Sequence, residues 1–338
     1  MFDSNQHEDL LEQLPKFSLD ESSFSFAPMS LPLQFYLEFY GFFEAMKGLE
    51  LEYFFGTREV RVESAVKGKD CKIATHYWQL PSPKATVFVV HGLYDHVGLF
   101  QKVIRFLLVE GYSVIAIDLP GHGLSDGEST KIGRFDDYAY VVTDALTFFE
   151  SELGDRPRYG LGQSTGAAVL MCAEFKAHST GKKALFDKLV FLGPLVRPRL
   201  AWVAYIAYLL LGRIMPSIAR ETSRPNSNDA DFHLFLSYQD PLQARRLSID
   251  WIRAMFLWVK QFNDQPVIDV PLLILQGTRD KVVDWRFNVP EIRKHFRNSQ
   301  VGYIKGAMHH LANEAEPWLK VVFSGMGGFF RRPSKSTK

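Results

Sequence analysis

The chain has 338 residues, and its 39 lysines and arginines nearly balance its 38 aspartates and glutamates, which gives a formal charge of +1. This balance excludes the broad basic surface that binding to a nucleic acid requires. A hydrophobic share of 46% is typical of a folded protein and not of a disordered one. Cys71 and Cys172 are too few for a disulfide framework. Residues 1–14 are acidic and lack the apolar core of a signal peptide, so we expect a cytoplasmic protein.

The first 60 residues differ from the rest because they hold 13 of the 47 aromatic residues, with 11 acidic and only 3 basic ones. Within this extension, residues 1–59, we predict one helix over residues 30–49. Ser30 would be its N-cap and Gly48 would end it. Aromatic side chains surround the helix axis, so a single face cannot bury them all. Two interpretations stay open: the helix packs in a groove of the main domain, or it contacts lipid or a partner.

Strand and helix patterns alternate from residue 60 onward. Residues 60–66 and 72–80 predict a β-hairpin. The next expected strands are short apolar runs, as in sheets buried on both faces. They cover residues 86–90, 112–118, 158–161, 188–192, 271–276 and 300–305. The helices expected between and after them cover residues 100–110, 135–153 and 165–178, and a last one starts near residue 316. This order predicts right-handed βαβ units and therefore an α/β fold with a mostly parallel, doubly wound sheet.

Residues 194–265 interrupt the alternation with helical patterns. We predict that they form an inserted helical cap over the carboxyl edge of the sheet, where such folds bind ligands. The body then consists of residues 60–193 and 266–326, followed by a basic tail, residues 327–338. Residues 200–211 are very apolar but too few to span a bilayer. Peripheral membrane contact is nevertheless a hypothesis for these residues, for the aromatic N-terminal helix and for Phe329-Phe330.

A G-x-S-x-G sequence at residues 162–166 lies between a predicted strand and a predicted helix. On such a strand–turn–helix the serine, here Ser164, is exposed at the sheet edge as a nucleophile. A serine hydroxyl needs a base, and the base needs an orienting carboxylate.

Candidates for the base and the carboxylate follow two later strands, in the chain order that doubly wound hydrolases use. Asp280 follows the strand at 271–276, with Asp284 as the competing acid. His309 follows the strand at 300–305, with His310 as the competing base.

The loop at residues 91–96, HGLYDH, follows the first parallel strand. A His-Gly turn at this place supplies an oxyanion donor, so the N–H groups of Leu93 and Thr165 are the candidate oxyanion hole. His91 and His96 could instead suggest metal ligands, but no third ligand lies nearby in the sequence. We therefore expect no metal site. Without a P-loop or a GxGxxG after the first parallel strand, no nucleotide cofactor is expected either.

Five motifs at these strand ends belong together. They are HGLYDH at 91–96, DLPGHGLSDG at 118–127, GQSTG at 162–166, GTRD at 277–280 and GAMH at 306–309. As a set they resemble the monoacylglycerol lipase and lysophospholipase branch of the α/β-hydrolases, over roughly residues 60–325. The resemblance implies an α/β-hydrolase fold with an inserted cap. It also implies Ser164 as nucleophile, Asp280 as acid and His309 rather than His310 as base, with Leu93 and Thr165 as oxyanion donors. The family often has methionine where this chain has Thr165, a change that leaves the backbone N–H in place.

The motifs together predict a cofactor-independent serine hydrolase that cleaves lipid-type carboxylic esters through an acyl-enzyme. Trp202, Tyr205 and Tyr208 of the cap would form an apolar wall for the acyl chain. Two alternatives stay open: a peptidase or amidase of the serine aminopeptidase type, and a hydrolase fold kept only for binding. The expected partner is a lipid-like ester and not a nucleic acid, and the sequence carries no prediction of oligomeric state.

Overall fold

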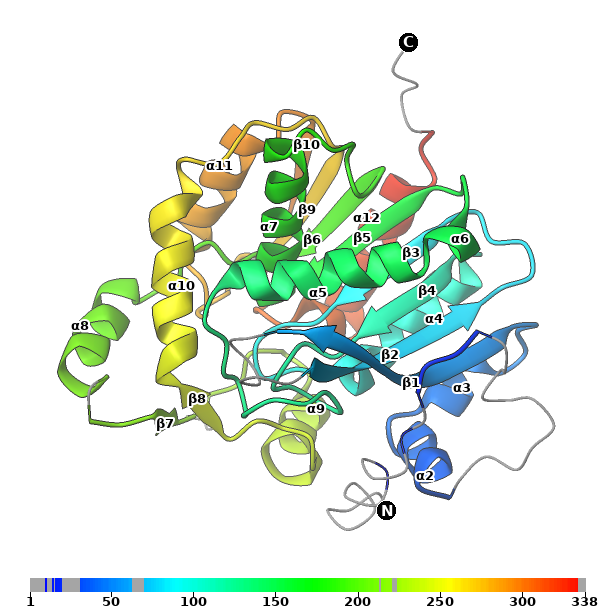
Figure 1. Ribbon diagram of the computed structural model, residues 1–338, viewed down its shortest axis with the longest axis horizontal. Coiled ribbons are helices and arrows are strands. Elements are labelled where there is room, and N and C mark those ends of the chain that lie inside the picture. The colour runs from blue at the N-terminus through cyan, green and yellow to red at the C-terminus, as the bar shows by residue number, and fades with distance from the viewer. Residues whose placement is uncertain are drawn as a thin grey trace.

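An eight-stranded sheet forms the centre of the molecule (Figure 1). The structure is a computed structural model that describes residues 10, 14, 16–19, 31–62, 70–212, 214–220 and 224–333. In spatial order, the strands are β1 (Glu52–Arg61), β2 (Asp70–Gln79), β4 (Ser113–Ile117), β3 (Thr86–Val90), β5 (Arg158–Gln163), β6 (Lys188–Leu192), β9 (Leu272–Gly277) and β10 (Ser299–Ile304). β2 runs antiparallel to both β1 and β4, and all other neighbours are parallel. The predicted mostly parallel sheet is therefore confirmed.

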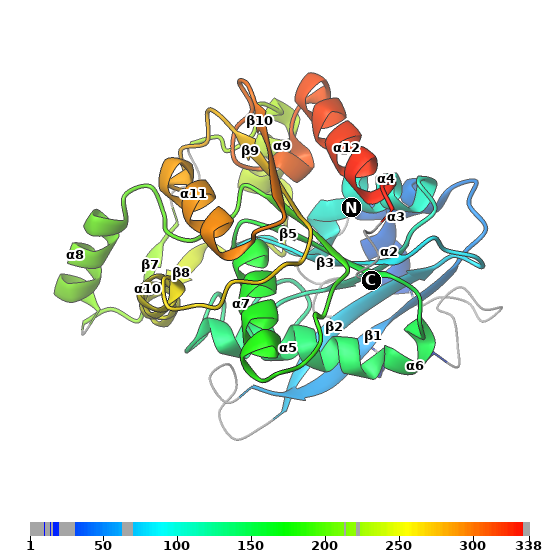
Figure 2. The same ribbon diagram turned by 90° about the horizontal axis from the view of Figure 1, so that it is seen from above.

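Helices cover both faces of this sheet (Figure 2). One face carries α5 (Phe135–Phe148), α6 (Glu150–Leu153), α7 (Thr165–Ser179) and α11 (Trp285–His295). The other face carries α2 (Leu31–Phe39), α3 (Phe42–Met46), α4 (Gln101–Val109) and α12 (Glu316–Phe330). The short turns η1 (Val97–Phe100) and η3 (Leu311–Asn313) lie on the second face as well. Because the strands are apolar on both sides, the buried residues form two clusters, one on each face.

The aromatic N-terminal segment packs on the body as two helices, not as the single helix expected over residues 30–49. The chain breaks between α2 and α3 at Gly41, whose φ of 73° lies in the left-handed region that glycine adopts freely. Tyr36, Leu37 and Phe42 are fully buried. Of the two interpretations left open, packing against the main domain is the one the structure supports. Ser30, the predicted N-cap, lies outside the described residues.

Strand β1 begins at Glu52, before the expected start at residue 60. The aromatic run Tyr53 to Phe55 is buried in the sheet, so these rings are part of the core. Residues 63–66 of the expected strand lie outside the part of the chain that the structure describes.

The segment between β6 and β9 holds the elements expected as a cap. They are α8 (Ala201–Leu211), β7 (Ser217–Ala219), α9 (Ala230–Leu234), the π-helical turn η2 (Phe235–Gln239), β8 (Arg246–Ser248) and α10 (Ile249–Phe262). The antiparallel pair β7–β8 was not expected from the helical pattern. α10 packs on the body, where Trp258 stacks on Phe135 of α5, whereas α8 lies at the outer edge of the molecule (Figures 1 and 2). None of the described helices has the length and apolarity needed to cross a membrane.

The end of the chain differs from the sequence-based expectation. α12 continues to Phe330, so residues 327–330 form its last turn and not a basic tail. Phe329 and Phe330 are buried, and Phe330 stacks on Tyr159 with 5.0 Å between ring centroids. The hypothesis that Phe329-Phe330 contacts a membrane is therefore wrong. Residues 334–338 lie outside the described residues.

Candidate active site

Ser164 occupies the sharp turn between β5 and α7, as the G-x-S-x-G sequence predicts. Its φ of 53° and ψ of −112° are strained for a residue with a Cβ. The flanking glycines are needed for space: a Cβ on Gly162 would lie 2.6 Å from the Ala167 nitrogen, and one on Gly166 only 2.1 Å from the Val90 oxygen. The chain therefore packs so closely around this turn that only glycine fits on either side of the serine.

The carboxyl ends of β9 and β10 bring an aspartate and a histidine to this serine. His309 Nε2 lies 3.0 Å from Ser164 Oγ, and His309 Nδ1 lies 2.8 Å from Asp280 Oδ2. The three side chains are buried. The three residues expected at three separate strand ends thus form one continuous chain of hydrogen bonds.

The Asp280 carboxylate is held by more than the histidine. Its Oδ1 accepts hydrogen bonds from the N–H groups of Val282, at 2.8 Å, and Val283, at 3.1 Å. Its Oδ2 accepts one from Gln276 Nε2 at 3.0 Å, in addition to that from His309. A carboxylate with four donors is fixed in orientation and stays ionised.

Burial and pairing act in opposite directions on the two ionisable groups. Burial alone would raise the pKa of Asp280, but the charge and hydrogen bond of His309 hold that pKa below its usual value. Burial alone would lower the pKa of His309, but the charge and hydrogen bond of Asp280 raise it above its ordinary value of 6.5. The pair therefore favours a positive imidazole ring, which is the form that a histidine takes after accepting a proton.

The two competing residues have other partners. Asp284 accepts two hydrogen bonds from the Arg197 guanidinium, at 2.7 and 3.0 Å. His310 Nε2 lies 3.2 Å from Asp95 Oδ2. Neither competing residue is recorded in contact with Ser164.

The candidate oxyanion donors flank the serine. Thr165 is the first residue of α7, where N–H groups have no partner in the preceding turn. Leu93 lies in a turn that the Asp95 N–H closes onto the Gly92 oxygen, and a Cβ on Gly92 would stand 3.4 Å from Ser164 Cβ. Within the described part of the chain, neither the Leu93 N–H nor the Thr165 N–H donates a hydrogen bond. Both groups are therefore available to an oxygen bound beside the serine.

One anchor of the histidine loop was not expected from the sequence. The N–H groups of His309 and His310 both donate to the Asn226 oxygen, at 3.0 and 2.8 Å. Ser227 Oγ donates to the Asn313 oxygen at 2.7 Å. The polar stretch at residues 224–229 thus anchors the loop that carries the histidine. Its clustered small polar side chains, typical of turns, are the sequence signal for this anchor.

The three cap residues expected to line an acyl pocket all lie on α8. They are Trp202, Tyr205 and Tyr208, and Trp202 is 67% exposed. The Tyr205 and Tyr208 rings contact Phe256 of α10, with centroids 5.0 and 6.3 Å apart. In the described structure no recorded contact joins the three to Ser164, so their role as an acyl wall stays a prediction.

His91 and His96 each have a protein partner. His91 Nε2 accepts a hydrogen bond from the Leu119 N–H at 2.9 Å, and burial lowers the pKa of His91 to about 3. His96 Nε2 lies 3.0 Å from Asp240 Oδ2. No three His, Cys, Asp or Glu side chains of the described residues group as metal ligands do.

Comparison with known proteins gives the family. Residues 81–316 match the model of the family described as serine aminopeptidase, S33. The monoglyceride lipase homolog of monkeypox virus is 30% identical over 258 residues, covering 73% of this chain and 89% of that protein. Human monoglyceride lipase is 27% identical over 260 residues, covering 73% of this chain and 82% of that protein.

A solved structure has the same fold. A soluble variant of monoglyceride lipase from Saccharomyces cerevisiae, in complex with a substrate analog, superposes with a TM-score of 0.66 at 17% identity. The match covers 81% of this chain and 96% of that one. The chain described here therefore belongs to the serine aminopeptidase S33 family of α/β-hydrolases and is a monoacylglycerol lipase-like member of it.

Proposed function

We propose that this protein hydrolyses carboxylic esters of the monoacylglycerol type through an acyl-enzyme. The observation that carries the proposal is the continuous line of contacts from the Asp280 carboxylate through the His309 ring to the Ser164 hydroxyl. The printed names of the relatives, monoglyceride lipases, support a lipid ester as the substrate class.

In this mechanism Ser164 Oγ attacks the ester carbonyl while His309 Nε2 takes its proton. The N–H groups of Leu93 and Thr165 stabilise the negative oxygen of the tetrahedral intermediate, and one such donor contributes about 3–4 kcal/mol. The carbon–oxygen bond to the alcohol then breaks, and His309 returns the proton to the leaving oxygen. A water molecule attacks the acyl-serine by the same route, which releases the acid and the free serine. Asp280 stays ionised throughout and holds the imidazole ring.

The direct test is Ser164→Ala. We expect kcat for 4-nitrophenyl butyrate to fall by about 10⁶-fold, because the triad acts as a unit. Ser179→Ala, at the far end of the same helix, is the matched control and should keep full activity. Turnover by Ser164→Ala at more than a small fraction of the wild-type rate would overturn the proposal.

Amide hydrolysis is the competing activity, since the family is described as serine aminopeptidases. Comparing kcat/KM for a monoacylglycerol with that for an aminoacyl anilide decides between the two. Labelling of the wild-type protein by a fluorophosphonate, lost in Ser164→Ala, would exclude the alternative of a hydrolase fold kept only for binding.

Contact of the cap with a lipid surface is part of the same proposal. α8 and the residues after it expose apolar side chains to solvent, namely Trp202, Val203, Tyr205, Ile206, Leu209, Ile214 and Met215. We expect the wild-type protein to float with phosphatidylcholine vesicles and a variant with Trp202→Ser and Ile206→Ser to float less. Val109→Ser, an equally exposed apolar residue on α4, is the control. Equal flotation of all three proteins would contradict a role for α8.

A further inference from the structure

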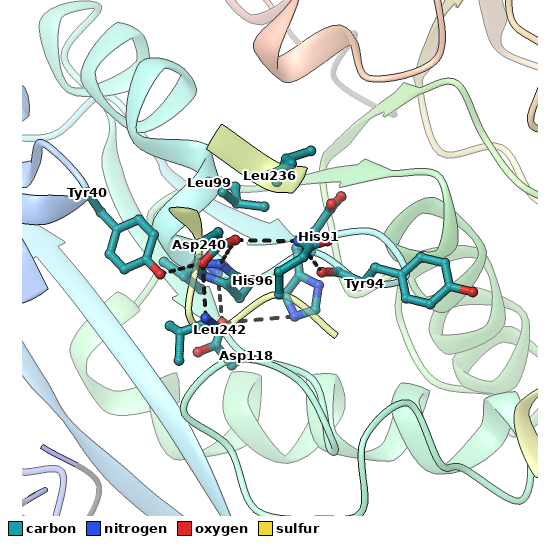
Figure 3. Close-up of polar contacts among 12 residues, drawn as sticks. Tyr40, His91, Tyr94, His96, Leu99, Asp118, Leu236, Asp240 and Leu242 are labelled. Carbon is teal, nitrogen blue, oxygen red and sulfur yellow. Dashed lines mark hydrogen bonds and ion pairs between the residues drawn. The ribbon is translucent and has the colours of Figure 1, made fainter. Parts of the chain in front are cut away.

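A buried polar cluster joins three segments that are far apart in the sequence (Figure 3). Tyr40, from the N-terminal segment, donates its hydroxyl to Asp240 Oδ1 at 2.7 Å, across 200 positions of the chain. Asp240, directly after η2, places Oδ2 3.0 Å from His96 Nε2, across 144 positions. All three side chains are buried. One carboxylate of the cap, residues 194–265 (called the inserted segment below), thus binds both the N-terminal segment and the loop that follows β3.

The N-terminal segment fits closely between these two parts. The Tyr40 ring packs edge-on against the His96 ring, with centroids 5.0 Å apart. A Cβ on Gly98 would stand 2.7 Å from Tyr40 Cδ1 and 2.8 Å from His96 Cε1, so only glycine leaves room for both rings. On the other side, the Phe39 ring contacts Phe235 of the inserted segment at 5.4 Å. Tyr40 is therefore positioned by packing on both of the parts that it joins.

The inserted segment also contacts the loop at residues 91–96, next to Leu93. Gln243 Nε2 donates to the Tyr94 oxygen at 3.1 Å and to Asp240 Oδ2 at 3.4 Å. The Arg220 guanidinium stacks 4.2 Å from the centre of the Tyr94 ring and donates to Gln243 Oε1. Tyr94 has a φ of 69°, a conformation that a residue other than glycine keeps only where its surroundings hold it.

These contacts lie directly after the candidate oxyanion donor, the N–H group of Leu93. Leu93 is followed directly by Tyr94, and the loop ends at His96. The inserted segment holds both residues from outside the loop through Gln243 and Asp240, and the Tyr40 ring of the N-terminal segment packs on His96 as well. Displacement of a preorganised donor by a fraction of an ångström weakens its action on the transition state more than on the bound substrate.

We infer that Asp240 is a positioning residue for the oxyanion loop and that Tyr40 fixes Asp240 in place. The N-terminal segment then acts on catalysis through the inserted segment, although it contributes no group to the triad. This inference rests on the proposed function, because it concerns the rate of the same ester hydrolysis.

The test uses full-length protein and a short soluble ester, 4-nitrophenyl butyrate. Tyr40→Phe keeps the ring and removes only the hydroxyl that bonds Asp240, and Asp240→Asn keeps the shape and removes the charge. We expect kcat to fall by about 3- to 10-fold in Tyr40→Phe and by about 10- to 30-fold in Asp240→Asn, with KM nearly unchanged. These losses are smaller than the 10²- to 10³-fold that follows removal of a whole donor.

Tyr53→Phe is the matched control. Its hydroxyl makes an equally buried bond, to His76 Nδ1 at 2.8 Å on β2, and not to the inserted segment. It should lower the melting temperature about as much as Tyr40→Phe while leaving kcat unchanged. Equal kcat in Tyr40→Phe and Tyr53→Phe at matched fractions folded would overturn the inference.

Failure of the proposed function would be distinguishable from failure of this inference. Wild-type protein and Ser164→Ala are measured in the same assay, and equal turnover by these two would refute the serine mechanism itself. If Ser164→Ala is inactive, a kcat loss confined to Tyr40→Phe and Asp240→Asn supports the positioning role. A rise in KM without a loss in kcat would contradict it, because that pattern indicates weakened substrate binding.

Discussion

The pairs His309–Asp280 and His96–Asp240 resemble each other in almost every local property. Each histidine is buried and lies 2.8 or 3.0 Å from one aspartate oxygen. In each, burial alone would lower the pKa of the histidine, and the aspartate raises that pKa above its usual value. They differ at the second ring nitrogen. His309 Nε2 meets Ser164 Oγ, whereas His96 Nδ1 has no hydrogen-bond partner among the described residues. A histidine whose pKa is raised by a neighbouring carboxylate is therefore not for that reason a catalytic base. A candidate base also needs a hydroxyl at its second ring nitrogen, as His309 has.

Replacing the aspartate of each pair is the strongest way to test this comparison. We expect Asp280→Asn to lower kcat by about 10⁴-fold, because the imidazole loses both its orientation and the charge that stabilises it once protonated. Asp240→Asn should cost far less, since its histidine transfers no proton. The measurement is kcat on the same soluble ester for both variants. Losses of similar size would show that the two pairs are not functionally different.

The pH profile of kcat/KM separates the pairs in a second way. In the proposed mechanism His309 accepts a proton only when neutral, so kcat/KM should fall about tenfold per pH unit below its pKa. Because Asp280 raises the pKa of His309 above 6.5, Asp280→Asn should move this acidic limb to lower pH. Asp240→Asn should leave the limb where it is. If the acidic limb moved in Asp240→Asn and not in Asp280→Asn, the titrating base would be His96 and not His309, and the comparison would fail.

The difference between the pairs also explains what the sequence could predict. Ser164, Asp280 and His309 each follow a short apolar strand, and parallel strands bring their carboxyl ends to one edge. Local patterns were therefore enough to bring them together. No local pattern relates Tyr40, His96 and Asp240, whose contacts arise only when three distant segments pack. In the sequence, His96 is part of the HGLYDH motif and a possible metal ligand, and neither pattern points to Asp240 or Tyr40.

Two other expectations concern side chains whose surroundings the sequence does not give. The apolar run of α8 suggested a wall for an acyl chain; Trp202 is 67% exposed there, and its role as a wall stays a prediction. Apolar composition does not distinguish a pocket lining from an exposed helix face. The aromatic N-terminal segment was expected as one helix between the N-cap Ser30 and Gly48, whereas the structure has a turn at Gly41. The rings of Tyr36, Tyr40 and Phe42 are buried in the cluster that includes the sheet and α4, which only the tertiary arrangement reveals.

The smallest expected effect concerns Asp284, the acid that competes with Asp280 in the sequence. Its carboxylate binds Arg197, and the two side chains are 27% and 36% exposed. Pairs this accessible to water contribute about 0–1 kcal/mol to stability. Asp284→Asn should therefore change kcat by less than about twofold and should lower the melting temperature only slightly. Kinetics on the soluble ester and a thermal melt of the same preparation measure both effects.

A loss of activity comparable to that of Asp280→Asn would mean that Asp284 reaches the histidine in the working enzyme. Activity retained by Asp284→Asn, with activity lost in Asp280→Asn, leaves Asp280 as the partner of the catalytic histidine, because no other carboxylate follows β9 at this edge of the sheet.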